Sequence, residues 1–247
     1  MQAQPGVLSP PKKHSLIQVY NFDDLPLITM NVARIGAQTP GMAFEISGQE
    51  KHFAVVGFGP MTWTWLTPDK PVPGGFKGFD ETEVEGEGVP ETDGDILLYI
   101  SSDHADLNRV IANQVREMFG KDGELIDEVV AESFTLTGSE PVAENILIDR
   151  ATNLDTEQSS FVFTQRFQGD EEVVSTHYQT SFILSAERYT LTYSNNPAEL
   201  EEHGDEVSRP PVSRGVFFIP SLDLLTSLRM GGIRMGSLAI NAKWKGH

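Results

Sequence analysis

The chain has 247 residues, of which 36 are Asp or Glu and 18 are Lys or Arg, giving a formal net charge of −18. This charge argues against a surface for nucleic acid or an anionic membrane, which would need clustered cations. Because there is no cysteine, disulfides, thiolate nucleophiles, zinc–thiolate sites, iron–sulfur clusters and cysteine-ligated haem are excluded. No segment has the apolar pattern of a signal peptide or a membrane span, so we expect a cytoplasmic protein.

The first third of the chain predicts two strands. Leu16–Tyr20 is a short candidate, and Phe53–Phe58 (FAVVGF) is a stronger one that ends before Gly59 and Pro60. Prolines within Asp23–Ser47 exclude a long uninterrupted helix between these two strands.

A buried strand and the clearest helix of the chain follow. The strand is Ile96–Ile100 (ILLYI), Ser102 or Asp103 is the expected helix cap, and Gly120 is the expected end of the helix. Apolar residues at helical spacing predict one buried face, formed by Leu107, Val110, Ile111, Val115, Met118 and Phe119. Leu125–Leu136 then predicts a single returning strand.

The second half repeats this order more faintly. Ser160–Phe167 predicts a strand, Glu171–Ala186 a helix, Tyr189–Tyr193 (YTLTY) a strand and Val216–Ile219 (VFFI) a final strand. A complete repeat needs a helix between the last two strands, but Asn195–Ser213 is polar, acidic and rich in proline.

This order of elements predicts an α+β fold. Strand, strand, helix and strand make up most of a ferredoxin-like β-α-β-β-α-β unit. We therefore expect two ferredoxin-like halves, packed as a dimeric α+β barrel-like unit, with the second half reduced. The expected halves are residues 1–140 and 141–247.

Asp149 is the strongest candidate for a functional side chain. The apolar run Ile146–Ile148 leads directly into this carboxylate, and a small polar turn follows it. A carboxylate at the end of a buried strand is costly unless it is paired or used. The competing interpretation is that Asp149 makes local hydrogen bonds within the turn.

Two segments resemble the signature of dye-decolourising (DyP-type) haem peroxidases. Residues 144–153 (ENILIDRATN) resemble the family's Gly-Phe-x-Asp-Gly-Thr-x-Asn-Pro motif, and residues 160–167 (SFVFTQRF) resemble the following strand, which ends in Gln-Arg-Trp. Other matching pieces occur in the family's order: PGVL at 5–8, FAVVGFGPMTW at 53–63, DILLYISSDHADLN at 95–108 and VSRGVFFIPSLDLLTSL at 212–228. The resemblance implies haem b held mainly by the second half, reduction of hydrogen peroxide, oxidation of an organic donor, and a homo-oligomer.

The resemblance also implies roles for particular residues. Asp149 corresponds to the acid–base residue beside the haem, Arg188 to the nearby cation, and His177 to the ligand of the haem iron. Positioned proton transfer contributes roughly 10²–10⁴-fold to a rate, and a cation stabilises a developing oxyanion. Other assignments stay open: Arg150, Arg166 and Arg214 are further candidate cations, and the ligand is His203 or absent if Phe182–Leu184 ends the helix before it.

The chain also departs from the family's pattern. Arg150 replaces the glycine after the aspartate, Leu154 replaces the final proline, and the stretch between Arg166 and Pro210 is shorter than in the family. Because that glycine lets the backbone approach the haem closely, an arginine there obstructs the approach. The alternative function is therefore a haem-free scaffold that acts as a binding or assembly protein.

Overall fold

The computed structural model describes residues 2–8, 12–23, 52–67, 94–131, 133–138, 147, 157–168, 176–183, 188–194, 213–225 and 227. The described strands are β1 (His14–Phe22), β2 (His52–Phe58), β3 (Ile96–Ser102), β4 (Gly123–Ala131), β5 (Ser133–Gly138), β6 (Ser160–Gln168), β7 (Thr176–Ile183), β8 (Arg188–Ser194) and β9 (Ser213–Ile219). The described helices are α1 (Pro5–Leu8), α3 (Pro60–Leu66) and α4 (Ala105–Phe119).

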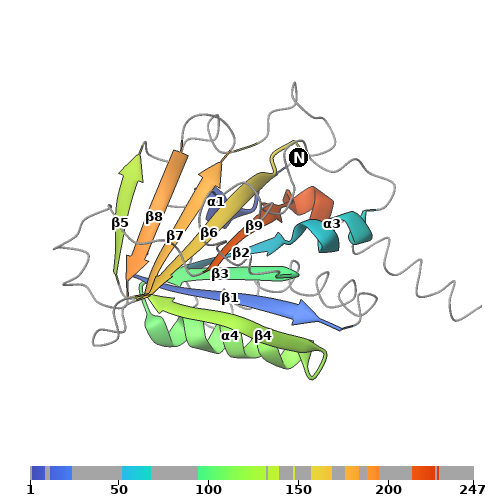
Figure 1. The fold of residues 1–247 in the computed structure, drawn as a ribbon, viewed down its shortest axis with the longest axis horizontal. Coiled ribbons are helices and arrows are strands. Elements are labelled where there is room, and N and C mark those ends of the chain that lie inside the picture. Colours follow the sequence, from blue (N-terminus) through green and yellow to red (C-terminus); the bar gives the residue numbers. More distant parts are fainter. Residues whose placement is uncertain are drawn as a thin grey trace, which may run out of the picture.

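All these strands belong to one antiparallel sheet in the order β4-β1-β3-β2-β9-β6-β7-β8-β5 (Figure 1). Its first four strands have the order expected of a ferredoxin-like unit, because β1 lies between β3 and β4 while α4 connects those two. The predicted α+β class with ferredoxin-like character is therefore confirmed. The predicted strands at 16–20, 53–58 and 96–100 are also confirmed, each with a longer extent.

Helix α4 covers one face of this unit, close to where it was expected. Its buried residues are Leu107, Asn108, Ile111, Ala112, Val115 and Phe119, and Gly120 ends it with a positive φ of 60°. The prediction that Val110 belongs to the buried face is wrong, since 41% of this residue is exposed.

The predicted cap of α4 is also wrong. The N-cap residue is His104, and its side chain makes no capping hydrogen bond. Ser102 ends β3 instead, and its hydroxyl accepts a hydrogen bond from the His104 N–H at 3.1 Å. The serine thus supports the turn between strand and helix rather than the first turn of the helix.

The predicted single strand at 125–136 is two strands on opposite edges of the sheet. β4 ends at Ala131 and β5 begins at Ser133, so only one residue separates them. Two residue steps span at most about 7 Å, so the sheet must curl until its two outer strands meet at this corner. Figure 1 shows β5 starting close to where β4 ends. This curl agrees with the expected barrel-like shape.

The prediction of a helix at Glu171–Ala186 is wrong. Thr176–Ile183 forms β7, which pairs with β6 on one side and β8 on the other. In this segment (THYQTSFI), Tyr178, Thr180 and Phe182 alternate with other residues, and β-branched and aromatic residues favour a pleated strand. The predicted strands at 160–167, 189–193 and 216–219 are confirmed.

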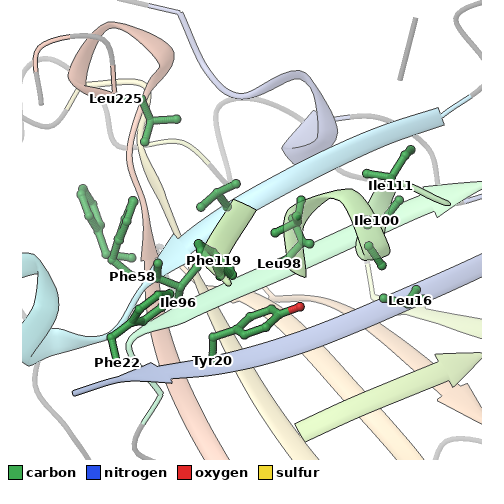
Figure 2. Close-up of a cluster of buried hydrophobic side chains, with 14 of the residues drawn as sticks. Leu16, Tyr20, Phe22, Phe58, Ile96, Leu98, Ile100, Ile111, Phe119 and Leu225 are labelled. Atoms are coloured by element: carbon green, nitrogen blue, oxygen red, sulfur yellow. The ribbon is translucent and has the colours of Figure 1, made fainter. Parts of the chain in front are cut away.

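Two apolar clusters occupy the two faces of the first half's strands. Residues alternate along a strand, so Leu16 and Tyr20 of β1 belong to the cluster under α4, whereas Ile17 and Val19 belong to the cluster on the other face. Under α4, the ring of Phe119 lies edge-on to Tyr20 and Phe22, with both centroid distances 4.8 Å (Figure 2). The second cluster also contains Val162 and Phe217 from β6 and β9.

Asp95 connects the start of β3 to two other elements. One carboxylate oxygen accepts a hydrogen bond from the Phe22 N–H at 2.8 Å, and the other accepts one from the Thr62 hydroxyl of α3. The Asp95 N–H donates to the Tyr20 carbonyl at 2.9 Å. This carboxylate therefore serves to position α3, an element absent from the sequence-based expectations.

The proposed boundary at residue 140 stays a prediction. Across it, β5 pairs with β8, while β2 and β9 share the single register pair Phe58↔Phe218. In the described ranges, no helix is both long enough and apolar enough to cross a bilayer.

The position of Phe119 generates a test of the apolar cluster under α4. Phe119→Ala should lower the free energy of unfolding by about 3–5 kcal/mol, because it leaves a cavity between α4 and β1. Urea unfolding followed by circular dichroism would measure this loss. Met61→Ala is the control, because Met61 is 83% exposed and its truncation should change stability by no more than about 0.5 kcal/mol. Equal effects of the two substitutions would contradict the core assignment.

Candidate functional site

The candidate acid–base residue follows a buried position. Asp149 lies outside the described residues, as do Arg150 and His203. Leu147, two residues before Asp149, is only 5% exposed and belongs to the apolar cluster that includes β6 and β9. The chain thus enters the core immediately before the candidate carboxylate.

The other two candidates lie on one β-hairpin, at opposite ends. His177 of β7 pairs with Phe167 of β6 and with Ser194 of β8, whereas Arg188 of β8 pairs with Ile183 of β7. Six residue steps separate the two positions along the hairpin, which corresponds to roughly 20 Å at ~3.3 Å per residue. The structure therefore does not bring these two residues together as neighbours.

Two other arginines lie closer to His177 in register. Arg166 of β6 pairs with Tyr178, the residue after His177, and Arg214 of β9 pairs with Gln165. The sequence alone did not order the candidate cations by distance from His177. The register does so, because it fixes which residues of β6, β7 and β9 lie side by side.

One alternative assignment of the ligand rested on a helix that is not present. Phe182 and Ile183 lie on β7 and not at the end of a helix. The helix on which this alignment relied is therefore wrong for Phe182 and Ile183, whereas His203 lies outside the described residues and its role as an alternative ligand stays a prediction.

Metal-ligating groups do not cluster in the described part of the chain. No group of three or more His, Cys, Asp or Glu residues there could hold a metal ion. Within the same part, the buried side-chain atoms without a hydrogen-bond partner are His14 Nδ1, Trp63 Nε1, Asn108 Oδ1 and Gln114 Oε1. These atoms belong to the first half and to none of the candidate site residues.

A polar network not expected from the sequence runs from the core to the surface. The buried Tyr20 hydroxyl donates to Gln18 Oε1 at 2.8 Å, and Gln18 Nε2 donates to Glu128 Oε2 at 2.5 Å. Arg116 Nη2 lies 3.7 Å from the same Glu128 oxygen. Burial raises the pKa of Tyr20 to about 12, against the opposing effect of the Arg116 charge. Tyr20 is therefore neutral at physiological pH.

The fold places the chain in an α+β class, and comparison with known proteins narrows that class. Residues 18–130 match the family model described as "Dyp-type peroxidase, N-terminal". Among curated proteins, none matches the chain.

Solved structures of dye-decolourising peroxidases resemble this chain over about nine tenths of its length. The peroxidase from Bacteroides thetaiotaomicron superposes with a TM-score of 0.67 at 17% identity, over 92% of this chain and 99% of that chain. A DypB variant from Rhodococcus jostii in complex with heme gives 0.66 at 19%, over 90% and 97%. The encapsulated DyP-type peroxidase from Mycobacterium smegmatis gives 0.63 at 17%, over 91% and 97%.

Residues 18–130 are thus similar to the N-terminal region of Dyp-type peroxidases, and the chain shares the fold of the solved structures over about nine tenths of its length. The resemblance inferred from the sequence is confirmed at this level. The roles of Asp149, His177 and Arg188 stay predictions.

The raised pKa of Tyr20 generates a test at alkaline pH. The stabilising contribution of neutral Tyr20 is fully present below pH 10, the ordinary pKa of tyrosine, and is lost as the pH rises towards about 12. The unfolded chain releases this proton first, so unfolding becomes easier across that window. Tyr20→Phe should remove this part of the loss, and should cost about 1 kcal/mol at neutral pH through the lost hydrogen bond to Gln18.

Urea unfolding of both proteins between pH 8 and pH 12 would measure the difference. The same alkaline slope for Tyr20→Phe and the unchanged protein would contradict the assignment.

Proposed function

We propose that this protein is a DyP-like haem peroxidase that reduces hydrogen peroxide and oxidises an organic donor. The observation that carries the proposal is the family match of residues 18–130, joined to a peroxidase fold over 90–92% of the chain. Three of the similar structures are Rhodococcus jostii DypB variants in complex with heme. We therefore propose haem b as the cofactor here.

The candidate residues fit a haem group by their chemistry. A neutral imidazole such as that of His177 is a common ligand of haem iron, and Asp149 and Arg188 supply a base and a cation. Along the β7–β8 hairpin, six residue steps of backbone, roughly 20 Å, separate His177 from Arg188. We propose that the haem group lies between these two positions, so that His177 and Arg188 reach the same group from different places on the hairpin.

Each candidate residue has one chemical task in this proposal. Haem iron, when bound, supplies the redox chemistry, and His177 holds it. Asp149 takes a proton from one oxygen of peroxide and returns it to the oxygen that leaves, which lowers the barrier to O–O cleavage. Arg188 stabilises the negative charge that develops on the leaving oxygen.

A haem-free scaffold is the second candidate function. Arg150 occupies the position of the family's glycine, and the next described elements after β6 are the paired strands β7 and β8. A haem pocket needs apolar walls on both sides of the group. If the arginine closes that space, the fold remains available for binding or assembly.

We also propose a cytoplasmic homo-oligomer that binds neither nucleic acid nor membrane. The net charge of −18 supports the absence of nucleic-acid and membrane binding, because it repels polyanions. Sedimentation of the full chain at several concentrations would measure the oligomeric state.

Haem binding separates the two candidate functions. Titration of the full chain with hemin should give a stoichiometric Soret band that His177→Ala abolishes, because the proposed iron ligand is removed. His104→Ala is the matched control, since His104 is an exposed histidine at the start of α4 and its loss should leave the band unchanged. No band with the unsubstituted, folded chain would reject the peroxidase and favour the haem-free scaffold.

Peroxide cleavage tests the role of Asp149. Asp149→Asn should keep the Soret band and slow the reaction with hydrogen peroxide by roughly 10²–10⁴-fold, because the amide cannot accept the proton. Stopped-flow absorption would measure the rate, with Asp103→Asn as a control at an exposed aspartate. An unchanged rate would remove Asp149 from the proposed chemistry.

A further inference from the structure

The sheet has one weak junction, between β2 and β9. Neighbouring pairs share long ladders, but β2 and β9 share only Phe58↔Phe218. Continued in the same antiparallel register, the ladder would bring Val56 opposite Pro220. Proline has no N–H and cannot donate to the Val56 carbonyl. The ladder therefore stops where its next hydrogen bond would be required.

The side chain of Gln4 fills this gap. Its Nε2 donates to the Val56 carbonyl and to the Pro220 carbonyl, both at 2.9 Å. Its Oε1 accepts a hydrogen bond from the Val56 N–H, also at 2.9 Å. The carboxamide thus makes the two bonds to Val56 that a peptide group of β9 would otherwise make. Gln4 is only 4% exposed, so water does not substitute for it.

The residues on either side of Gln4 attach this segment of the chain to the rest of the structure. We call residues 2–8 the N-terminal strap; its helical part, α1, lies next to the junction in Figure 1. The Gln2 N–H donates to the Asp223 carboxylate at 2.7 Å, and the Gln2 carbonyl accepts from the Leu222 N–H at 2.8 Å. Val7 is buried in the second apolar cluster.

The fit of the strap is close at one position. A Cβ added to Gly6 would lie 2.5 Å from Val55 Cγ2 and 2.8 Å from Phe53 Cδ2. The strap backbone therefore lies directly against the side chains of β2. Glycine is required there because any larger residue would push the strap away from the sheet.

We propose that the N-terminal strap is a latch whose release opens the junction between β2 and β9. Release leaves the Val56 N–H and two carbonyls without partners in a buried place, which is unfavourable unless water enters. Opening of the strap and opening of the junction are therefore one event. β2 and β9 share one register pair, whereas β1 and β3 share seven, so the strap and the junction open without unfolding of the first half.

Hydrogen exchange of the unsubstituted full chain tests this latch. The amides of Val7, Val56 and Leu222 should exchange together, at least tenfold faster than the amides of β1 and β3. Their rates should also depend only weakly on low urea concentrations, because local opening exposes little surface. Exchange of these three amides at the global unfolding rate, with the same urea dependence as β3, would overturn the proposal.

Substitutions give a second, independent measurement. Gln4→Ala and Gly6→Ala should each accelerate exchange at Val56 and Leu222 at least tenfold and leave the β1 and β3 amides unchanged. Gln18→Ala is the matched control, because Gln18 is an equally buried glutamine with hydrogen bonds away from the junction. Acceleration of Val56 exchange by Gln18→Ala to the same degree would overturn the proposal.

Discussion

Burial of β1 and β3 on both faces is the constraint on which the rest of the first half depends. Every residue of β3 is buried, so each of its faces needs its own apolar cover. Helix α4 covers one face, and the second apolar cluster, with residues from α1, β6 and β9, covers the other. A flat sheet would leave Ile17, Val19 and Leu97 in water, at a cost of roughly 1.5–3 kcal/mol each. The curl of the sheet follows from this requirement.

The elements that could be predicted are those whose pattern is complete within a few residues. The run ILLYI at Ile96–Ile100 and the helical spacing of α4 each carry their own signal. The break between β4 and β5 carries none, because no glycine or proline interrupts the alternation around Glu132. At β7 the local signal was ambiguous, and pairing with β6 and β8 determined the outcome.

The candidate site stays a prediction, and the sequence proposes its residue types without their arrangement. Resemblance to a family motif identifies Asp149 and His177, but their distance depends on strand register and on segments far apart in sequence. Gln4 is a second case in which contacts between distant residues decide the outcome, because nothing near Gln4 in the sequence indicates its role. That role arises because Pro220, 216 residues later, lacks the N–H that the sheet requires at that place.

The contacts of the strap also join residues that are synthesised at very different times. Gln2 and its partner Asp223 are 221 residues apart, so at ~5–20 residues per second the ribosome makes them roughly 10–45 s apart. The ferredoxin-like unit from β1 to β4 is complete long before that. During this interval Gln2 and Gln4 lack their partners near β9, and the apolar face of β1 and β3 that β6 and β9 later cover is exposed to water.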